Sequence, residues 1–527
     1  MKISEKFNQL PLAAKTTIVW AGFFLPFAAI NLATPGYWDD GYYHARHAYK
    51  MVETGNLTYL DNWIAFNFLS YAPVDPWWGF HLIQAAFIYL FGLFAGVKLA
   101  AAALSSLIFA VYYWLISRLS IRKPLIWTIL FFSSSALFQF RLLLERPFIV
   151  ALSVLPLGWW LINRRKYPQL FVLSLVFALL YNLSPLIIFL SFVYLLAEWF
   201  VAKKINLRPL ITATAGVIAG VALHPEGLNY VFVMVVHIWQ VLYLRFSGVF
   251  LPIGGEVQQL GFQYTVSFSF IAIVLYMISV ALFFSDFKKN RRDLTGVFLF
   301  LFSFGWFALM FTVPRTADFW MPFAWLFIAY VVSRFFSSDD FGLAKQRMKG
   351  LVGVDVLSKL LLAIAAVLVL NNLLQVSGVR YDKLNGPDRD QYFAEATDWL
   401  KANTKPGTLI FADNWSYFPK VYFFDQQNKQ LAGFDPTFFY EYDNELYWLW
   451  YNLSNSGLYC NRPTYCTDIS EKESIKMIPH LIKERFGTDI ILARNDPRLP
   501  FTILLEKDRK HYELKFINSY FRIYRVL

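Results

Sequence analysis

A succession of long apolar segments through roughly the first 370 residues constrains the fold more than any other feature of this sequence. A hydrocarbon layer about 30 Å thick requires helices of about 20 apolar residues, whereas a soluble core could not absorb so many of them. Only 16% of the residues are charged, compared with about 25% in an ordinary soluble domain. The sequence therefore predicts a polytopic α-helical membrane protein.

About eleven segments are expected to cross the bilayer. They are residues 16–32, 99–117, 124–141, 147–163, 168–183, 185–201, 207–223, 265–285, 295–312, 318–335 and 352–371. Two further apolar stretches, 78–96 and 228–244, could either cross the bilayer or lie along its surface. The first segment has the length of a signal peptide, but we expect an uncleaved span because many further spans follow it.

The distribution of Lys and Arg orients these segments, because short basic loops stay on the cytoplasmic side. If neither ambiguous stretch crosses, every basic cluster between spans falls inside; if both cross, the first three clusters move outside. The pattern favours an N-terminus inside and a C-terminus outside. A first outer loop (about 35–98) and a late outer loop (about 224–264) then face outward. These clusters account for the net charge of +12 as topology signals, so no nucleic-acid partner is expected.

The C-terminal part has the pattern of a soluble α/β domain. We expect a transmembrane domain over residues 1–375 and this second domain over residues 380–527. Its predicted helices are 389–402 and 471–486, and its predicted strands are 408–412, 489–493 and 521–527. Its two cysteines, Cys460 and Cys466, could form a local disulfide in an oxidising compartment or stay as two thiols.

Two adjacent carboxylates, Asp39 and Asp40, follow the first span in the sequence Asp-Asp-Gly-Tyr-Tyr-His-Ala-Arg. Adjacent carboxylates at a membrane interface repel each other and are costly to desolvate, so they usually serve a cation, a metal or a proton transfer. A second charged motif, Arg141-Leu-Leu-Leu-Glu145-Arg146-Pro147, lies at the seam between two apolar spans. The competing explanations are a solvated loop for the first motif and an ordinary helix start for the second.

The first motif resembles the first-loop motif of oligosaccharyltransferase catalytic subunits, in particular the bacterial form Asp-Gly-Tyr-Tyr. The second resembles the second acidic motif of protein O-mannosyltransferases and aminoarabinose transferases. All of these enzymes belong to the GT-C superfamily of membrane glycosyltransferases. The resemblance implies that Asp40, helped or replaced by Asp39, acts on the acceptor as catalytic base or through a metal, and that Glu145 is the second acid. Glu256 falls where oligosaccharyltransferases place a further acidic residue in a late outer loop.

Three arginines are candidates for the phosphate of a lipid-linked sugar donor, because a guanidinium binds phosphate bidentately. Arg315 lies between two spans on the outer side, and Arg146 or Arg141 could assist it. The alternative for Arg315 is a salt bridge to Asp318 or Asp40. Both interpretations place Arg315 on the face that carries Asp40.

Further residues are candidates for substrate binding. Tyr43 and His44 follow Asp40, and His224 lies at the start of the late outer loop, although single histidines near helix ends are more often structural. Trp415 and Tyr417 occupy the place where oligosaccharyltransferases carry Trp-Trp-Asp-Tyr-Gly, a motif that this chain lacks. Sequon-directed glycosylation is therefore not implied.

The sequence thus predicts a GT-C-like glycosyltransferase of the cell membrane (inner or plasma). It would move a sugar from a polyprenyl phosphate or pyrophosphate to an extracytoplasmic glycan, lipid or protein acceptor. Asp40 and Glu145, with substrate phosphate, could hold Mg²⁺ or Mn²⁺. Three alternatives stay open: oligosaccharyltransferase-like protein glycosylation, a transporter or flippase of lipid-linked sugars, and a membrane scaffold without catalysis.

Overall fold

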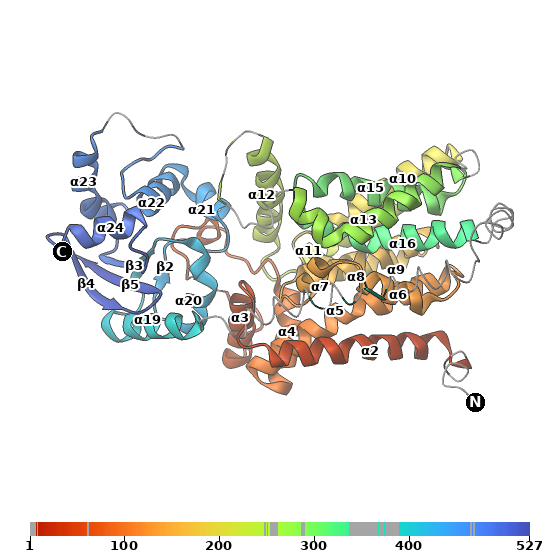
Figure 1. The fold of residues 1–527 in the computed structure, drawn as a ribbon, viewed down its shortest axis with the longest axis horizontal. Coiled ribbons are helices and arrows are strands. Elements are labelled where there is room, and N and C mark those ends of the chain that lie inside the picture. The colour runs from red at the N-terminus through yellow and green to blue at the C-terminus, as the bar shows by residue number, and fades with distance from the viewer. Residues whose placement is uncertain are drawn as a thin grey trace.

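The structure is a computed structural model with two parts, a bundle of apolar helices and a C-terminal α/β region (Figure 1). It describes residues 7, 9–60, 63–246, 249, 251–252, 262–285, 290–336, 366–367, 370, 374, 389–463, 466 and 469–527. The predicted span 352–371, residue Glu256 and the far end of the predicted first domain lie largely or wholly outside this part of the chain.

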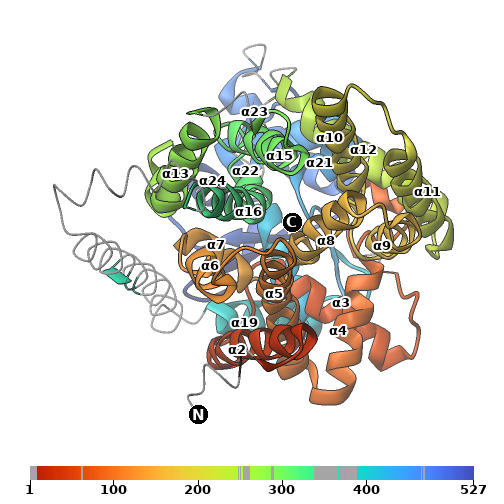
Figure 2. The ribbon, with the colours of Figure 1, turned by 90° about the vertical axis from the view of Figure 1, so that its right-hand side faces the viewer.

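Most of the bundle helices lie side by side along the long axis of the molecule, and Figure 2 views them end-on. They are α2 (Leu12–Ala33), α5 (Leu93–Arg118), α6 (Pro124–Phe132), α7 (Ala136–Leu142), α8 (Phe148–Asn163), α9 (Tyr167–Leu180), α10 (Leu186–Ala202), α11 (Arg208–Leu223), α13 (Phe262–Ser285), α15 (Leu294–Met310) and α16 (Ala317–Phe336). Over the residues that the structure describes, three segments are long and apolar enough to cross a membrane, Leu12–Ala33, Leu93–Arg118 and Pro314–Phe335. The chain is a membrane protein, and the count of eleven spans stays a prediction.

The predicted span 124–141 is two helices rather than one. Helices α6 and α7 meet at an angle of 88°. Three consecutive serines separate them: the Ser133 and Ser134 hydroxyls donate to backbone carbonyls of α6, and the Ser135 oxygen accepts from the Phe138 N–H to start α7. Serine hydroxyls compete with the helix for backbone groups, which explains the break. The bend directs α7 into the turn that carries Glu145.

Three helices from the predicted outer loops, α3 (Gly41–Thr54), α4 (Trp78–Phe91) and α12 (Gly227–Phe246), lie at the end of the bundle nearest the C-terminal region (Figure 1). Helix α12 runs across the bundle direction, consistent with the surface interpretation of residues 228–244. The ambiguous stretch 78–96 is divided at Gly92, whose φ of 79° ends α4 before α5 begins. Glycine adopts this left-handed conformation without steric cost.

The C-terminal region holds a five-stranded sheet in the order β2-β1-β3-β5-β4. Strands β2, β1 and β3 are parallel, and β5 and β4 join antiparallel. The strands are β1 (Leu409–Ala412), β2 (Lys429–Gln430), β3 (Ile490–Arg494), β4 (Tyr512–Ile517) and β5 (Phe521–Val526). The helices are α19 (Arg389–Asn403), α20 (Phe418–Phe424), α21 (Pro436–Tyr442), α22 (Asn444–Ser456), α23 (Glu471–Glu484) and α24 (Pro500–Lys507). Cys460 and Cys466 form a disulfide, which decides between the two expectations for them.

A short segment of the first outer loop, residues 63–66, extends this sheet at its β2 edge. The Gln430 N–H donates to the Trp63 carbonyl at 2.6 Å, and the Ala65 N–H donates to the Gln430 carbonyl at 2.8 Å. Ile64 and Gln430 form a parallel bridge. The sheet therefore joins chain segments that lie more than three hundred residues apart in the sequence.

Candidate active site

The two adjacent carboxylates lie at the amino end of α3. Helix α3 begins at Gly41, and the Asp40 side chain does not cap it. Asp39 has a φ of 37°, a left-handed conformation that aspartate tolerates better than most residues. The Asp39 side chain is 73% exposed and that of Asp40 is 42% exposed. The partial positive charge of a helix amino end stabilises carboxylates placed there.

Glu145 lies in the turn between α7 and α8 and reaches the same place. Its side chain is fully buried, and Oε2 accepts a hydrogen bond of 3.1 Å from the Trp38 N–H. A methyl group built on Gly41 would lie 2.6 Å from Oε2. Only glycine at position 41 thus lets the Glu145 carboxylate pack against the start of α3, beside Asp40. The structure brings together the two acids that the motifs singled out separately.

Arg146 joins the two motifs directly. One guanidinium nitrogen lies 3.3 Å from Asp40 Oδ2 and 3.6 Å from Asp39 Oδ2. The Arg146 side chain is only 10% exposed, so its charge acts in a medium of low polarity where ion pairs are strong. The result is a cluster of three carboxylates and one guanidinium, open to solvent on the Asp39 and Asp40 side.

A buried lysine that sequence analysis missed adds a second positive charge near this cluster. Lys98 lies near the start of α5, and its ammonium donates to the carbonyls of Asn31 at 2.8 Å and Thr34 at 2.6 Å. It is close enough to Glu145 for the two charges to interact. The signal was available, because a lysine within an apolar span is a functional candidate by default. Burial, and then the nearby Glu145 charge, raise the pKa of the neighbouring Tyr37 phenol.

Arg141 has a different partner from Arg146. Its guanidinium forms a buried ion pair with Asp318 of α16, with N–O distances of 2.8 and 3.0 Å, and lies over the Phe148 ring. This pair ties α7 to α16 just before the Glu145 turn. Asp318 was one of the two carboxylates expected to compete for Arg315; the other, Asp40, contacts Arg146. The phosphate-binding role of Arg141 stays a prediction.

Arg315 lies in a short 3-10 turn, Pro314–Thr316, that leads into α16. It is half-buried, and its charge and that of Asp435 in the C-terminal region both act on His237 of α12. Arg315 therefore lies at the end of the bundle that faces the C-terminal region, as predicted. Its role in phosphate binding stays a prediction.

Tyr43 and His44 are buried one turn into α3. The Tyr43 ring packs edge-on against Phe434 of the C-terminal region, with ring centroids 4.7 Å apart. His44 Nδ1 lies 2.8 Å from His81 Nε2. Burial, followed by the charges of His81 and Arg146, holds the pKa of the His44 imidazole well below its usual range. A neutral His44 beside the acid cluster could take part in hydrogen bonding without adding charge.

His224 is buried at the end of α11, where it stacks on Tyr230 with ring centroids 4.2 Å apart. Its Nε2 lies 3.1 Å from the Asp75 carbonyl oxygen and its Nδ1 lies 3.5 Å from Glu226 Oε2. These contacts hold the loop before α4 against α11. They favour the structural interpretation of His224 that the sequence left open.

Trp415 and Tyr417 lie in the C-terminal region beside the sheet. Tyr417 is 4% exposed and packs against Phe393 and Phe521 in the core, while Trp415 is partly buried. The Tyr417 ring is thus a core element rather than part of an open surface. Substrate binding by Trp415 stays a prediction.

The C-terminal region docks directly onto α3. The Tyr42 hydroxyl hydrogen-bonds to Asp390 of α19, and the same carboxylate accepts from the Lys420 ammonium at 2.5 Å. Arg46 contacts Gln426. The helix that carries the acids is therefore held between the bundle on one side and the C-terminal region on the other.

Comparison with solved structures decides the fold. The chain is similar to ArnT from Cupriavidus metallidurans bound to undecaprenyl phosphate, with a TM-score of 0.52, 11% identity and 97% of each chain covered. The apo form of that protein gives a TM-score of 0.53, 12% identity and coverage of 97% of this chain and 96% of the other. The chain has the GT-C fold. The resemblance that the motifs suggested is confirmed at the level of the fold.

A third solved structure with this fold is the Archaeoglobus fulgidus oligosaccharyltransferase in complex with Zn and sulfate. The TM-score is 0.55 at 12% identity, and the alignment covers 98% of this chain and 73% of the other. No family model matches the sequence. No curated protein matches it either. The GT-C fold is thus recognised through structure, and the roles of Asp40 and Glu145 stay predictions.

Proposed function

We propose that this chain is a glycosyltransferase that moves a sugar or oligosaccharide from a polyprenyl phosphate or pyrophosphate to an acceptor on the extracytoplasmic side of the cell membrane. One observation carries the proposal: Asp40, Glu145 and Arg146 meet around Gly41 at the end of an apolar bundle. A transfer site for a lipid-linked sugar needs carboxylates and a cation at a membrane surface, and this cluster supplies both.

Each residue of the cluster has a distinct task in the proposed reaction. Asp40, which is partly exposed, accepts the proton of the acceptor hydroxyl as its oxygen bonds to the anomeric carbon. The bond from that carbon to the phosphate oxygen breaks, and the phosphate leaves on the lipid. Glu145 is buried and positions the acceptor or the start of α3. Arg146 and Arg315 stabilise the negative charge on the leaving phosphate.

The polyprenyl donor is supported by the likeness to ArnT, which was solved with undecaprenyl phosphate. The bundle supplies apolar surfaces that an isoprenoid tail could follow, such as the exposed Leu25, Leu107 and Phe189. The Cys460–Cys466 disulfide supports an extracytoplasmic position for the C-terminal region, because disulfides persist in oxidising compartments. Its docking on α3 supports the same side for the acids.

A divalent cation has candidate ligands in this cluster. Asp40 and Glu145 would hold Mg²⁺ or Mn²⁺, whose preferred ligands are carboxylate and phosphate oxygens. Such an ion would supply positive charge to the leaving phosphate. Arg146 already contacts Asp40 and brings a positive charge to the same place, so the proposed steps above use the residues of the chain alone.

The deciding experiment reconstitutes the full-length protein in liposomes with a labelled polyprenyl-phosphate sugar and a panel of glycan, lipid and peptide acceptors. Release of polyprenyl phosphate together with a labelled acceptor is the expected result. Asp40→Asn should lower the rate by on the order of 10²-fold or more. Asp398→Asn is the matched control, because Asp398 lies on the surface of α19 with its side chain 70% exposed. An equal loss of transfer rate in Asp40→Asn and Asp398→Asn would contradict the assignment of Asp40.

The same assay separates the alternative functions. A flippase would move the labelled lipid across the bilayer with its sugar–phosphate bond intact. A scaffold would neither move the lipid nor transfer the sugar. Transfer to a peptide acceptor alone would indicate oligosaccharyltransferase-like activity.

A further inference from the structure

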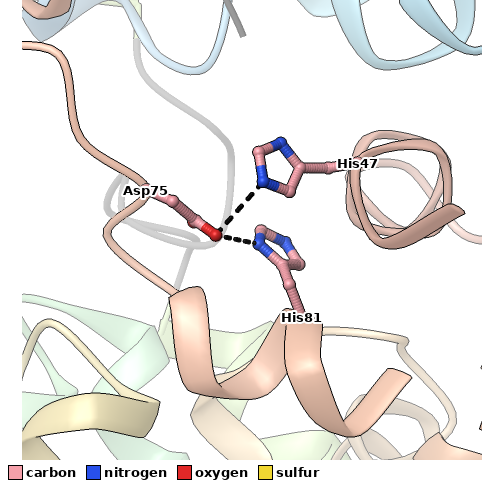
Figure 3. Close-up of side chains that lie close together, drawn as sticks. All are labelled: His47, Asp75 and His81. Carbon is pink, nitrogen blue, oxygen red and sulfur yellow. Dashed lines mark hydrogen bonds and ion pairs between the residues drawn. The ribbon is translucent and has the colours of Figure 1, made fainter. Parts of the chain in front are cut away.

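Two histidines and an aspartate of the first outer loop converge (Figure 3). His47 comes from α3, His81 from α4, and Asp75 from the loop before α4. Asp75 Oδ2 lies 2.6 Å from His81 Nδ1 and 3.2 Å from His47 Nε2. All three side chains are buried, and their ligand-type atoms lie within 4.8 Å of one another. This group is separate from the carboxylates of Asp40 and Glu145.

The second ring nitrogen of each histidine and the second carboxylate oxygen of Asp75 also have partners. His81 Nε2 lies 2.8 Å from His44 Nδ1, and His47 Nδ1 lies 3.4 Å from the Tyr43 hydroxyl. Asp75 Oδ1 accepts from the Trp77 N–H at 3.0 Å. A metal-bound histidine almost always hydrogen-bonds through its second nitrogen, which fixes the ring and its tautomer. All three side chains have such a hydrogen-bond partner at their second polar atom.

We propose that His47, Asp75 and His81 form a binding site for a divalent transition metal of the zinc class. Two imidazole nitrogens and one carboxylate oxygen suit Zn²⁺ better than Mg²⁺, which prefers oxygen ligands. Ligands on a tetrahedral ion with bonds of about 2.1 Å lie roughly 3.4 Å apart. The 3.2 Å pair already matches this spacing, and the 2.6 Å pair needs to open by about 0.8 Å.

An ion could reach these residues from a pocket beside them. His47 lines a small pocket together with Tyr43, Trp63, Phe418 and Phe434. The pocket lies between the first outer loop and the C-terminal region. Three protein ligands leave a fourth position on a tetrahedral ion for water or another ligand.

Metal binding at this place would connect the two helices of the first outer loop. His47 lies about two turns along α3 from Asp40, and His81 lies in the first turn of α4. An ion between them fixes α3 against α4 and thereby the position of the acids at the start of α3. The ion is thus a structural clamp next to the acid cluster rather than a participant in the transfer.

The test measures metal directly. The full-length protein is purified in detergent through a tag without histidines, stripped with a chelator, and titrated with Zn²⁺ and with Co²⁺. We expect one tightly bound ion per chain, a cobalt absorption spectrum typical of four ligands with nitrogen donors, and a higher melting temperature with the ion. Magnesium at the same concentration should not displace Co²⁺ from this site, whether or not it binds at Asp40 and Glu145.

Variants locate the site. His47→Gln and Asp75→Asn should each weaken Zn²⁺ binding by on the order of 10²-fold or more, and His44→Gln, which removes a partner of His81, by about 10-fold to 100-fold. His480→Gln is the matched control, since His480 lies on α23 with its side chain 72% exposed. Melting curves without metal show whether each variant folds. Folded wild-type protein that binds neither ion, or equal weakening by His480→Gln, would overturn the proposal.

Discussion

Gly41 and Glu145 are in direct contact, because the Glu145 carboxylate occupies the space that a side chain at position 41 would need. A methyl group there would lie 2.6 Å from Oε2 and 3.3 Å from the Glu145 Cβ. The contact brings the turn after α7 against the start of α3. The two charged motifs of the sequence become one cluster at this contact.

Gly41→Ala should therefore lower transfer activity strongly. The added methyl group must displace Glu145 or the start of α3, and a displacement of about 1 Å in a catalytic group can cost on the order of 10²-fold in rate. Gly22→Ala is the control, because nothing lies within 4 Å of a side chain built at that position in α2. Rates in the liposome assay, with melting temperatures measured in parallel, check the prediction. If Gly41→Ala is as active as Gly22→Ala, this prediction is wrong.

The Arg141–Asp318 pair should matter for stability. Both side chains are at least nine-tenths buried, so Asp318→Asn leaves a guanidinium without its counter-charge, at a cost of about 3 to 5 kcal/mol. Replacing both partners together, as in Arg141→Met with Asp318→Leu, should recover much of this loss. Melting temperatures in detergent measure the effect. If the double variant also keeps full transfer activity, Arg141 does not bind the donor phosphate.

Tyr42→Phe should loosen the attachment of the C-terminal region. The hydroxyl hydrogen-bonds to the Asp390 carboxylate, and a hydrogen bond to a charged group contributes about 1.5 to 3 kcal/mol. Hydrogen exchange in α19 and α20 should become faster, while exchange in α8 and α15 stays unchanged. Tyr89→Phe, at a tyrosine that is 80% exposed, is the control. Unchanged exchange in α19 would show that other contacts hold the two parts together.

Asp413 should make the C-terminal region less stable as the pH rises. Burial raises the pKa of its carboxyl to about 6, although hydrogen bonds from the Arg494 N–H and the Tyr417 hydroxyl oppose this rise. Because the pKa is higher in the folded chain than in the unfolded one, the stabilising contribution is fully present below about pH 4. It is lost as the pH rises to about 6.

Asp413→Asn carries no titrating group, so its advantage over the wild type should grow between about pH 4 and pH 6 and then level off. The size of the change is on the order of 3 kcal/mol, because the pKa is raised by about two units and each unit corresponds to about 1.4 kcal/mol. Comparing melting temperatures of the two proteins across this range cancels the titration of all other groups. A constant difference would contradict the raised pKa.

Local patterns were sufficient for part of the secondary structure of the C-terminal region, while β2, β4 and helices α20, α21, α22 and α24 were not predicted. The strand predicted at 408–412 is observed as Leu409–Ala412, and the helix predicted at 389–402 as Arg389–Asn403. Each of these elements has its own apolar periodicity, which the sequence shows directly. The bend between α6 and α7 was missed because apolar content alone was considered. The three serines at 133–135 carried the missing signal.

The site could be predicted only in part. The motifs singled out Asp40 and Glu145, but the approach of Glu145 to Gly41 is a tertiary contact between the start of α3 and the turn after α7, and no local pattern encodes that. The group of His47, Asp75 and His81 was missed for the same reason, since its members come from different elements of the chain. Lys98 was missed although its place in an apolar span marked it as a candidate. Residues that act together through tertiary contacts leave no spacing rule to recognise.

The pairing of residues 63–66 with β2 has a consequence for biosynthesis. The ribosome makes residues 63–66 long before it makes β2. This edge of the sheet therefore stays incomplete until the two segments pair. In residues 389–527 produced alone, β2 would be an exposed edge strand with unpaired backbone N–H and C=O groups. Such an edge promotes aggregation. Secretion of that fragment by itself should fail unless the 63–66 peptide is supplied in trans.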